Sequence, residues 1–300
     1  MENAETFVIS TTSEGESFLE KYTGNEKIVE IPAKITAIGD DAFLNNSSLE
    51  EIKIPQGVDY IGNYAFCGCA NLKSVLLPES LQEINIGSFM GCENLFKTNL
   101  PEKLRIIGSK AFLNCPKLEL ESVPRFLIEV AKDSFDDTKK LLLEKKDNYM
   151  EENGLLYNLE SKSLLFATEE TLDSVKIKNG TKYLGWNCLS NLPSLEKVSL
   201  PDSVAYIGRG AFMFSKKLSK IILPPSVQSI DSGAFFNCVN LNEVIVQGEG
   251  LSQICDEAFL GCESLRTITI PEDCEVCEDS FEKSCSVKRR EEKKSKSARR

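Results

Sequence analysis

The chain has 300 residues, with 46 acidic and 35 basic side chains, a formal net charge of −11 and a hydrophobic content of 41%. It contains no histidine, so the commonest general base and the commonest transition-metal ligand are missing, which disfavours an enzyme. The acidic start and the lack of an apolar run of about 18 residues predict neither a secretory signal nor a membrane span. Eleven cysteines in such a chain indicate reduced thiols in an intracellular protein.

Prolines recur at a fixed interval of 23 residues, at Pro32, Pro55, Pro78, Pro101 and Pro124, and the series resumes at Pro201 and Pro224. A fixed period of this length is typical of a solenoid or an array. Each period carries Ile-Gly, Ala-Phe, often Cys, then Leu, and it closes with alternating apolar residues. We expect successive phenylalanines to stack in one core, and the Asn or Gly two places later to adopt positive φ. The recurring cysteine is most simply a small buried residue, with a redox or metal role as the alternative.

The repeat closely resembles the BspA-type leucine-rich repeat, on "IPQGVDYIGNYAFCGCANLKSVLLP" and "LPDSVAYIGRGAFMFSKKLSKIILP". The resemblance covers about residues 28 to 285. It implies a curved, right-handed, horseshoe-like α/β solenoid of mainly short parallel strands with turns, in which each unit gives one strand to a concave sheet. Members of that family are interaction proteins, including microbial and protist surface proteins linked to adhesion. The resemblance implies no shared catalytic residues.

In chain order, residues 1–31 are expected to form an N-terminal cap or partial repeat, and residues 32–143 form leucine-rich repeats. A β-hairpin insertion is predicted at 144–177, because "LLYNL" and "SLLFA" flank a polar turn from Glu160 to Lys162. The hairpin either packs beside the sheet or protrudes as a binding element. Residues 178–285 are predicted to form further repeats and a C-terminal cap. One inserted residue before Phe259 and one missing residue before Phe281 fit the atypical repeats of a cap.

The C-terminal end combines a cysteine cluster with a basic segment. Cys274, Cys277 and Cys285, with Cys255 and Cys262 one unit earlier, give only a weak zinc signal because their spacing matches no common zinc module. We therefore expect no metal and no cofactor. Residues 286–300 are expected to be a basic disordered tail. Its options are nuclear import, attraction to anionic lipid or nucleic acid, or attraction to the acidic body, although a short basic tail is a poor nucleic-acid footprint.

Partner binding is predicted on the side chains that point outward from the repeat strands, 19 and 21 places after each proline position. Apolar members of this set suggest protein contact. Trp186 stands at a position that is polar or turn-like in other units, and it either anchors a partner or packs on the hairpin or a neighbouring unit. The expected partner-binding residues are Leu76, Lys97, Lys197, Lys220, Ile222, Glu243, Ile245 and Trp186.

The sequence thus predicts a non-catalytic protein-binding scaffold that uses the concave sheet of a leucine-rich-repeat solenoid. It binds a protein partner, without a specific nucleic acid or a transmembrane segment. A cytoplasmic location is expected, with the nucleus (through the basic tail) and the cell surface as alternatives. A rival function is a surface adhesion protein exported without a signal peptide. A third is an enzyme centred on the hairpin insertion, with carboxylates near Glu151 and Glu152, for which the sequence offers no convergent constellation.

Overall fold

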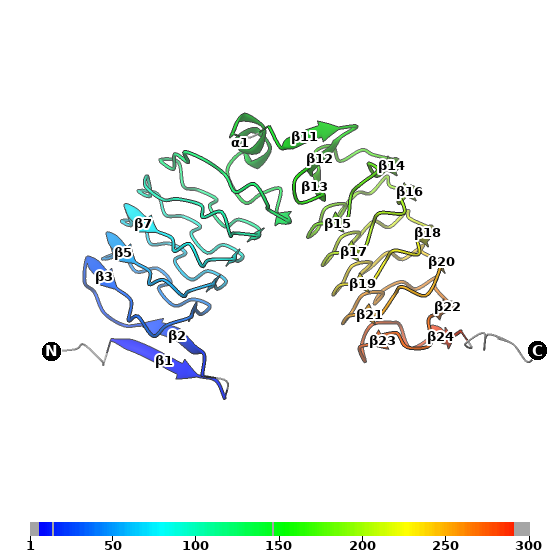
Figure 1. Cartoon of the computed structure of the whole chain (residues 1–300), viewed down its shortest axis with the longest axis horizontal. Coiled ribbons are helices and arrows are strands. Elements are labelled where there is room, and N and C mark those ends of the chain that lie inside the picture. Colours follow the sequence, from blue (N-terminus) through cyan, green and yellow to red (C-terminus); the bar gives the residue numbers. More distant parts are fainter. Residues whose placement is uncertain (1–5, 14, 146, 291–300) are drawn as a thin grey trace, which may run out of the picture. The chain divides into compact units, whose positions relative to one another are not determined.

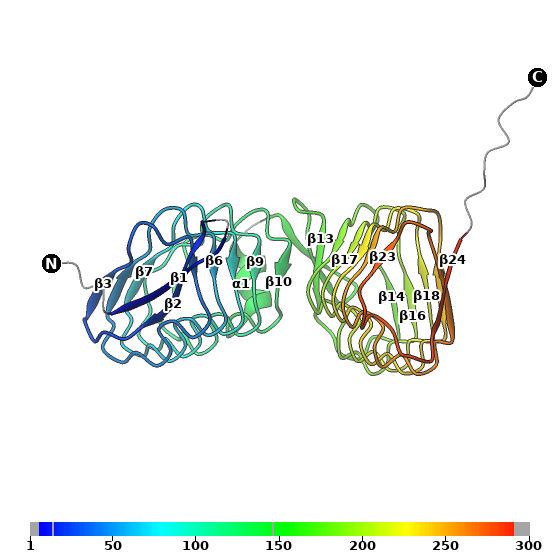
Figure 2. The ribbon, with the colours of Figure 1, turned by 90° about the horizontal axis from the view of Figure 1, so that it is seen from below.

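The computed structural model describes residues 6–13, 15–145 and 147–290, in two compact units whose boundary in the sequence follows Thr168. Each unit is a solenoid whose turns stack side by side (Figures 1 and 2). The solenoid fold predicted from the sequence is therefore confirmed. The unit boundary falls inside the predicted insertion at 144–177, so residues 144–168 belong to unit 1 and residues 169–177 belong to unit 2.

Most turns contribute two strands rather than the one that the sequence predicts. We call the sheet made mainly of two-residue strands the inner sheet, which in unit 1 also includes the longer strands β1 (Phe7–Thr11) and β2 (Ser17–Tyr22). The sheet of three- and four-residue strands is called the outer sheet. In unit 1 the inner sheet has the order β1, β2, β4 (Ala37–Ile38), β6 (Tyr60–Ile61), β8 (Glu83–Ile84), β9 (Ile106–Ile107) and β10 (Glu129–Val130). The outer sheet of unit 1 consists of β3 (Ile28–Glu30), β5 (Glu51–Lys53) and β7 (Ser74–Leu76).

Unit 2 repeats this arrangement with inner and outer strands in alternation. Its inner strands are β15 (Tyr183–Leu184), β17 (Tyr206–Ile207), β19 (Ser229–Ile230), β21 (Gln253–Ile254) and β23 (Glu275–Val276), which are hydrogen-bonded in this order. Its outer strands are β14 (Ser174–Lys176), β16 (Lys197–Ser199), β18 (Lys220–Leu223), β20 (Glu243–Val246), β22 (Thr267–Ile270) and β24 (Ser286–Arg289). They pair only as β14–β16, β18–β20 and β22–β24.

The two sheets lie on opposite sides of each turn, and each unit by itself curves toward its inner sheet (Figure 1). The reason is the hydrogen-bond ladder. Unbroken pairing holds neighbouring strands about 4.8 Å apart, so the uninterrupted inner sheet is the shorter side, whereas the outer sheet of unit 2 is broken twice. The prediction that the strands at 51–53, 74–76 and their equivalents form the concave face is therefore wrong.

Stacked phenylalanines fill the core between the two sheets, as the sequence predicts. The ring centroids of Phe66 and Phe89 are 5.0 Å apart with an interplanar angle of 7°, and both side chains are buried. In unit 2 the stack runs from Phe212 through Phe235 and Phe259 to Phe281 with centroid distances of 4.9, 4.9 and 5.0 Å. The inserted and the missing residue therefore lie in loops and leave the stack intact. The predicted positive φ is also confirmed, with 57° at Asn45 and 72° at Gly68.

Both ends of the described chain are closed by strands. β1 and β2 form an antiparallel hairpin, and β2 pairs parallel with β4, so the N-terminal cap extends the inner sheet. At the other end, β24 pairs parallel with β22 on the outer sheet. The backbone N–H of Arg290 donates to Ile270 C=O at 2.9 Å. The prediction of a disordered tail at 286–300 is therefore wrong for residues 286–290. Residues 291–300 lie outside the described residues.

The insertion after Phe135 is partly helical. Helix α1 (Thr138–Lys145) begins after Asp137, whose carboxylate accepts a hydrogen bond from the Lys140 N–H at 3.1 Å as an N-cap does. It takes up Leu141, which the sequence assigned to the repeat. Strands β11 (Tyr149–Glu152), β12 (Leu155–Asn158) and β13 (Ser163–Ala167) follow as an antiparallel meander. Its β12–β13 hairpin is the one that the sequence predicts.

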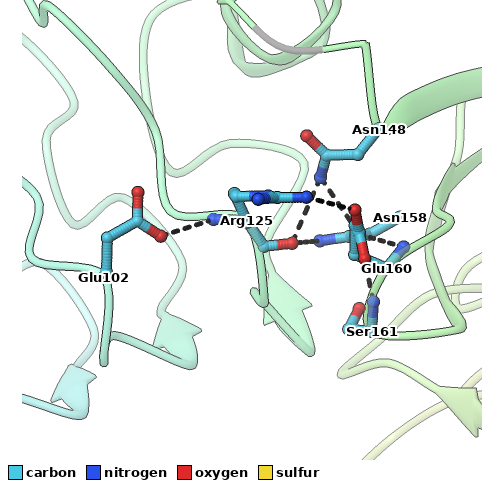
Figure 3. Close-up of polar contacts among 6 residues, drawn as sticks. All are labelled: Glu102, Arg125, Asn148, Asn158, Glu160 and Ser161. Carbon is cyan, nitrogen blue, oxygen red and sulfur yellow. Dashed lines mark hydrogen bonds and ion pairs between the residues drawn. The ribbon is translucent and has the colours of Figure 1, made fainter.

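Buried residues and a polar network hold the hairpin against the solenoid. Every residue of β12 and β13 is buried, so the hairpin packs beside the inner sheet instead of protruding. Asn158 donates to the backbone C=O groups of Arg125 and Leu127, both at 3.0 Å. Its amide oxygen accepts the N–H groups of Glu160 and Ser161 (Figure 3). The Arg125 guanidinium closes the network with an ion pair to Glu160 at 2.6 Å.

Candidate binding surface

The inner sheet of unit 2 carries an ordered pair of aromatic side chains. Because side chains alternate along a strand, the second residue of β15, β17, β19 and β21 is buried and the first faces out. Leu184 and Ile207 accordingly lie in the core, whereas Tyr183 and Tyr206 are partly exposed. The strands pair in register, and the two tyrosine rings stack with centroids 5.0 Å apart and an interplanar angle of 8°.

Charged and polar groups fix these tyrosines in place. The Lys182 Nζ lies 5.3 Å from the ring centroid of Tyr183 and 5.6 Å from that of Tyr206, within cation–π range. The Tyr206 hydroxyl makes a hydrogen bond with the Gln228 Oε1 at 2.7 Å. Restrained rings lose less conformational entropy when a partner binds them.

A second cation–π pair follows on the same two turns. Trp186 and Arg209 each come two residues after an inner strand, and the guanidinium carbon of Arg209 lies 5.3 Å from the ring centroid of Trp186. Trp186 is half-buried and Arg209 is exposed. We call the set of Lys182, Tyr183, Trp186, Tyr206, Arg209 and Gln228 the aromatic surface.

Unit 1 has a different chemistry at the equivalent positions. Tyr60, Glu83, Ile106 and Glu129 take the outward places of successive inner strands. Partial burial, with a smaller contribution from Asp59, raises the pKa of Glu83. Stacked rings flanked by cations are therefore a property of unit 2 in the part of the chain that the structure describes.

The predicted partner-binding residues fall on three separate surfaces. Five of them gather on the outer sheet of unit 2: Lys197, Lys220, Ile222, Glu243 and Ile245. There the Lys220 ammonium lies 2.9 Å from the Glu243 carboxylate, and Ile222 is directly opposite Ile245 in the β18–β20 register. Leu76 is 70% exposed on the outer sheet of unit 1. Lys97 lies beside this sheet, where its backbone forms an isolated parallel β-bridge with Ser74. Trp186 lies on the aromatic surface.

The gap in the outer ladder between β16 and β18 forms a groove of about 580 Å³. Lys197, Lys220 and Ile222 line it together with Glu196 and Lys217. The Lys217 ammonium is 3.6 Å from the Glu196 carboxylate. The sequence thus brings most of its predicted set to one place, but on the convex outer sheet instead of the concave face.

Tyr183, Tyr206 and Arg209 were missed by the sequence analysis. Tyr183 precedes Leu184-Gly185, and Tyr206 and Arg209 flank Ile207-Gly208, so all three lie next to the core residues of the repeat. The available signal was the recurrence of tyrosine at the same place in two successive periods, at Tyr183 and Tyr206.

The repeated cysteines occupy a structural position. Cys69, buried in the core, donates its S–H to the Phe43 C=O in the preceding turn at 3.1 Å, and Cys238 does the same to Phe212. Burial raises the pKa of both thiols to about 12, so they stay neutral and poorly nucleophilic. Ser215 takes the cysteine place one turn earlier and donates to the Leu189 C=O at 3.0 Å. The position therefore selects a small hydrogen-bond donor. Within residues 6–13, 15–145 and 147–290, no cluster of three acidic or cysteine side chains is arranged to hold a metal ion.

Glu151, proposed above as a catalytic carboxylate, takes part in local packing. The Lys139 ammonium lies 2.7 Å from its carboxylate, and the Thr168 hydroxyl also donates to it. The hydrogen bond from Lys139, followed by that from Thr168, lowers the pKa of Glu151. A general base working near neutral pH needs the opposite shift.

The two sheets, the stacked core and the 23-residue turns define a leucine-rich-repeat solenoid. The chain belongs to the BspA-type leucine-rich repeat family, whose model matches residues 15–142 and 161–288 in six copies. No curated protein sequence matches the chain significantly. Nor does any helix within the described residues have the length and apolar character needed to cross a membrane.

Several solved structures are similar to this chain. A leucine-rich cell surface protein from Faecalibacterium prausnitzii is 23% identical, with 97% of this chain and 95% of that chain covered and a TM-score of 0.49. A leucine-rich repeat protein from T. pallidum is 22% identical, covering 88% and 90% of the two chains, with a TM-score of 0.38. The pneumococcal vaccine antigen PcpA is 19% identical, covering 94% of this chain and 77% of its own, with a TM-score of 0.41.

Proposed function

We propose that this chain is a non-catalytic protein-binding scaffold whose partner contacts the aromatic surface of unit 2. The observation that supports the proposal is the stacked pair of Tyr183 and Tyr206, held by Lys182 and flanked by Trp186 and Arg209. Tyr, Trp and Arg are the side chains most enriched at interface hot spots. Repeat proteins use the concave side of their solenoids to hold partners.

The outer-sheet residues predicted from the sequence form the rival surface. Ile222 is 42% exposed there and lines the groove between β16 and β18. Clustered apolar side chains on a surface favour protein contact. However, the breaks in the outer ladder leave this face less ordered by backbone hydrogen bonds than the inner sheet.

One binding experiment separates the two surfaces. The partner is first isolated with the full chain, and its affinity is then measured for two double variants. Trp186→Ala with Tyr206→Ala should weaken binding by about 2 kcal/mol or more, a hot-spot magnitude. Ile222→Asp with Ile245→Asp on the outer sheet is the matched control and should bind normally. The reverse pattern, with both variants folded by circular dichroism, would move the site to the outer sheet.

The cellular setting proposed is the cytoplasm, with surface adhesion as the alternative function. The proposal rests on the cysteine content of the chain, which favours a reducing compartment. Protease treatment of intact cells followed by immunodetection distinguishes them, because only a surface protein is digested. Digestion of the chain on intact cells would replace the scaffold proposal with adhesion.

A further inference from the structure

Strand β1 is an unusual edge strand. It lies at the end of unit 1 (Figure 1) and has five residues, whereas the inner strands from β4 onward have two each. No charged residue or proline occurs from Thr6 to Ser13. Natural proteins blunt sheet edges with short strands, charges or proline to prevent pairing. The outer-sheet edge strand β24, by contrast, carries Lys288 and Arg289. β1 has the length and composition of a strand that pairs.

Alternate backbone groups of β1 point away from β2. The Thr23 N–H donates to Thr6 C=O at 2.8 Å, and the Thr12 N–H donates to Glu16 C=O at 2.9 Å. Thr6 and Thr12 therefore face β2. The register shift between Val8 and Ile9 skips a residue on β2 only, so the alternation along β1 is preserved. The backbone N–H and C=O groups of Phe7, Ile9 and Thr11 then point away from β2, in the plane of the sheet. These groups have no partner within the described residues.

We infer that β1 pairs antiparallel with β1 of a second copy of this chain, about a two-fold axis at Ile9. This register sets Phe7 opposite Thr11 of the second copy and Ile9 opposite Ile9. Every outward N–H and C=O then meets an outward partner. No like charges oppose each other, because the strand is uncharged. A two-fold dimer with one self-complementary patch is the commonest protein assembly.

Side-chain packing also favours β1 of a second copy as the strand that pairs with this edge. Phe7 and Ile9 are only half-buried, and they line a groove of about 1100 Å³ together with Ile31, Pro32 and Ile54. Side chains directly opposite in an antiparallel pair lie about 4.5–5.5 Å apart at Cβ. The second copy therefore brings its own Phe7 and Ile9 alongside and removes more of this apolar surface from water. This inference is independent of the proposed partner surface on unit 2.

Sedimentation of the full chain over a range of concentrations tests the pairing. The wild type should associate to a dimer. Thr11→Pro removes an outward N–H and leaves the backbone hydrogen bonds to β2 intact, so it should raise the dimer dissociation constant by about tenfold or more. It also removes the side-chain hydrogen bond between Thr11 and Ser17. Thr11→Val keeps the N–H and is the matched control, which should dimerise normally. A monomeric wild type overturns the proposal and leaves the edge to a strand of another protein. A dimer unaffected by Thr11→Pro also overturns it.

A cross-link tests the register without relying on proline. Ile9→Cys should form a covalent dimer under mild oxidation, because the two-fold axis brings the two thiols together. Ile222→Cys, at an exposed side chain on β18 of unit 2, is the control and should cross-link no more than the wild type. The cross-linking experiment alone tests β1 pairing if circular dichroism shows that Thr11→Pro is misfolded. Equal cross-linking of the two cysteine variants would contradict pairing at Ile9.

Discussion

At the scale of single residues, the repeat is held by side chains whose role depends on the preceding turn. The cysteine that recurs after most Ala-Phe pairs was predicted to be small and buried, and Cys69 and Cys238 are buried. Its function as a hydrogen-bond donor was not predicted. The acceptor carbonyl lies 26 residues earlier, in the preceding turn, and the repeat pattern places side chains in neighbouring turns without giving the direction of their backbone carbonyls. The serine at 215 was the available clue, since Ser and Cys share little besides size and a donor hydrogen.

We predict that Cys69→Ser is less destabilising than Cys69→Ala. Serine keeps a donor for Phe43 C=O, as Ser215 does for Leu189. Alanine removes one of the two hydrogen bonds to that buried carbonyl, which also accepts the Asn46 N–H at 3.0 Å, and the loss of one hydrogen bond costs about 0.5–1.5 kcal/mol. Urea unfolding measures the difference, with Phe66→Ala as a reference expected to lose roughly 3–5 kcal/mol. Alanine and serine variants of equal stability would show that the hydrogen bond contributes nothing.

The same thiol makes stability depend on alkaline pH. Its pKa rises from the ordinary value of 9.0 to about 12 on folding, chiefly because of burial. Only the unfolded chain releases the proton between these values, so the stabilisation is complete below pH 9 and is lost as pH rises toward 12. Above pH 9 the unfolding free energy of the wild type should fall more steeply than that of Cys69→Ser, by about 1.4 kcal/mol per pH unit. Urea titrations at several pH values provide the slopes; parallel slopes would disprove the linkage.

At the scale of secondary-structure elements, the sequence predicts the outer strands and the hairpin but misses the inner strands and α1. The outer strands and β12–β13 are long enough to show alternation. An inner strand such as Tyr60–Ile61 has only two residues, so it has no periodicity to detect. Its pairing comes from the neighbouring turns. The aromatic surface was missed for the same reason, since the residues that flank an undetected strand have no predicted direction. Helix α1 was missed because Leu141 also fits the repeat spacing.

We predict that the hairpin depends on Asn158 and not on the ion pair beside it. Asn158 is fully buried and satisfies two carbonyls and two N–H groups. Asn158→Ala should therefore destabilise unit 1 by about 3 kcal/mol, because several buried polar groups lose their partner. Glu160→Gln removes the exposed ion pair with Arg125 and should cost no more than about 1 kcal/mol. Thermal melts followed by circular dichroism compare the two. A larger loss with Glu160→Gln would assign the docking to the ion pair.

At the scale of the whole molecule, the strands at the two ends of the solenoid determine which sheet edges are exposed. Exposed sheet edges invite pairing, and unit 2 closes its outer sheet with β24. Arg290 adds a second fastening, since its guanidinium donates to the backbone of Val246 and Gly248 and lies 2.8 Å from the Glu249 carboxylate. The sequence suggested none of this, because the basic composition of 288–290 is also that of a solvated tail.

We predict a sharp difference between two truncations. Removing residues 286–300 deletes β24 and Arg290, uncovers the β22 edge, and should lower the melting temperature of unit 2 by several degrees, about 4 °C or more for each kcal/mol lost in a domain of this size. Removing only 291–300 should leave the melting temperature nearly unchanged, because that segment has little apolar surface to bury. Calorimetry of both chains provides the comparison. Equal melting temperatures would mean that β24 does not stabilise unit 2.

The aromatic column also determines how this molecule can grow. In unit 1 Phe66, Phe89 and Phe112 each stack on a ring 23 residues before and another 23 residues after, as Phe66 stacks on Phe43 and Phe89. Such neighbours are near in sequence, so the core can assemble by propagation from any turn instead of waiting for distant segments to meet. The number of repeats can therefore change without altering the core of the remaining turns. Duplication or loss of one whole period in the coding sequence leaves every ring with a neighbour of the same kind, and a change of one residue is tolerated where a loop absorbs it, as before Phe259 and Phe281.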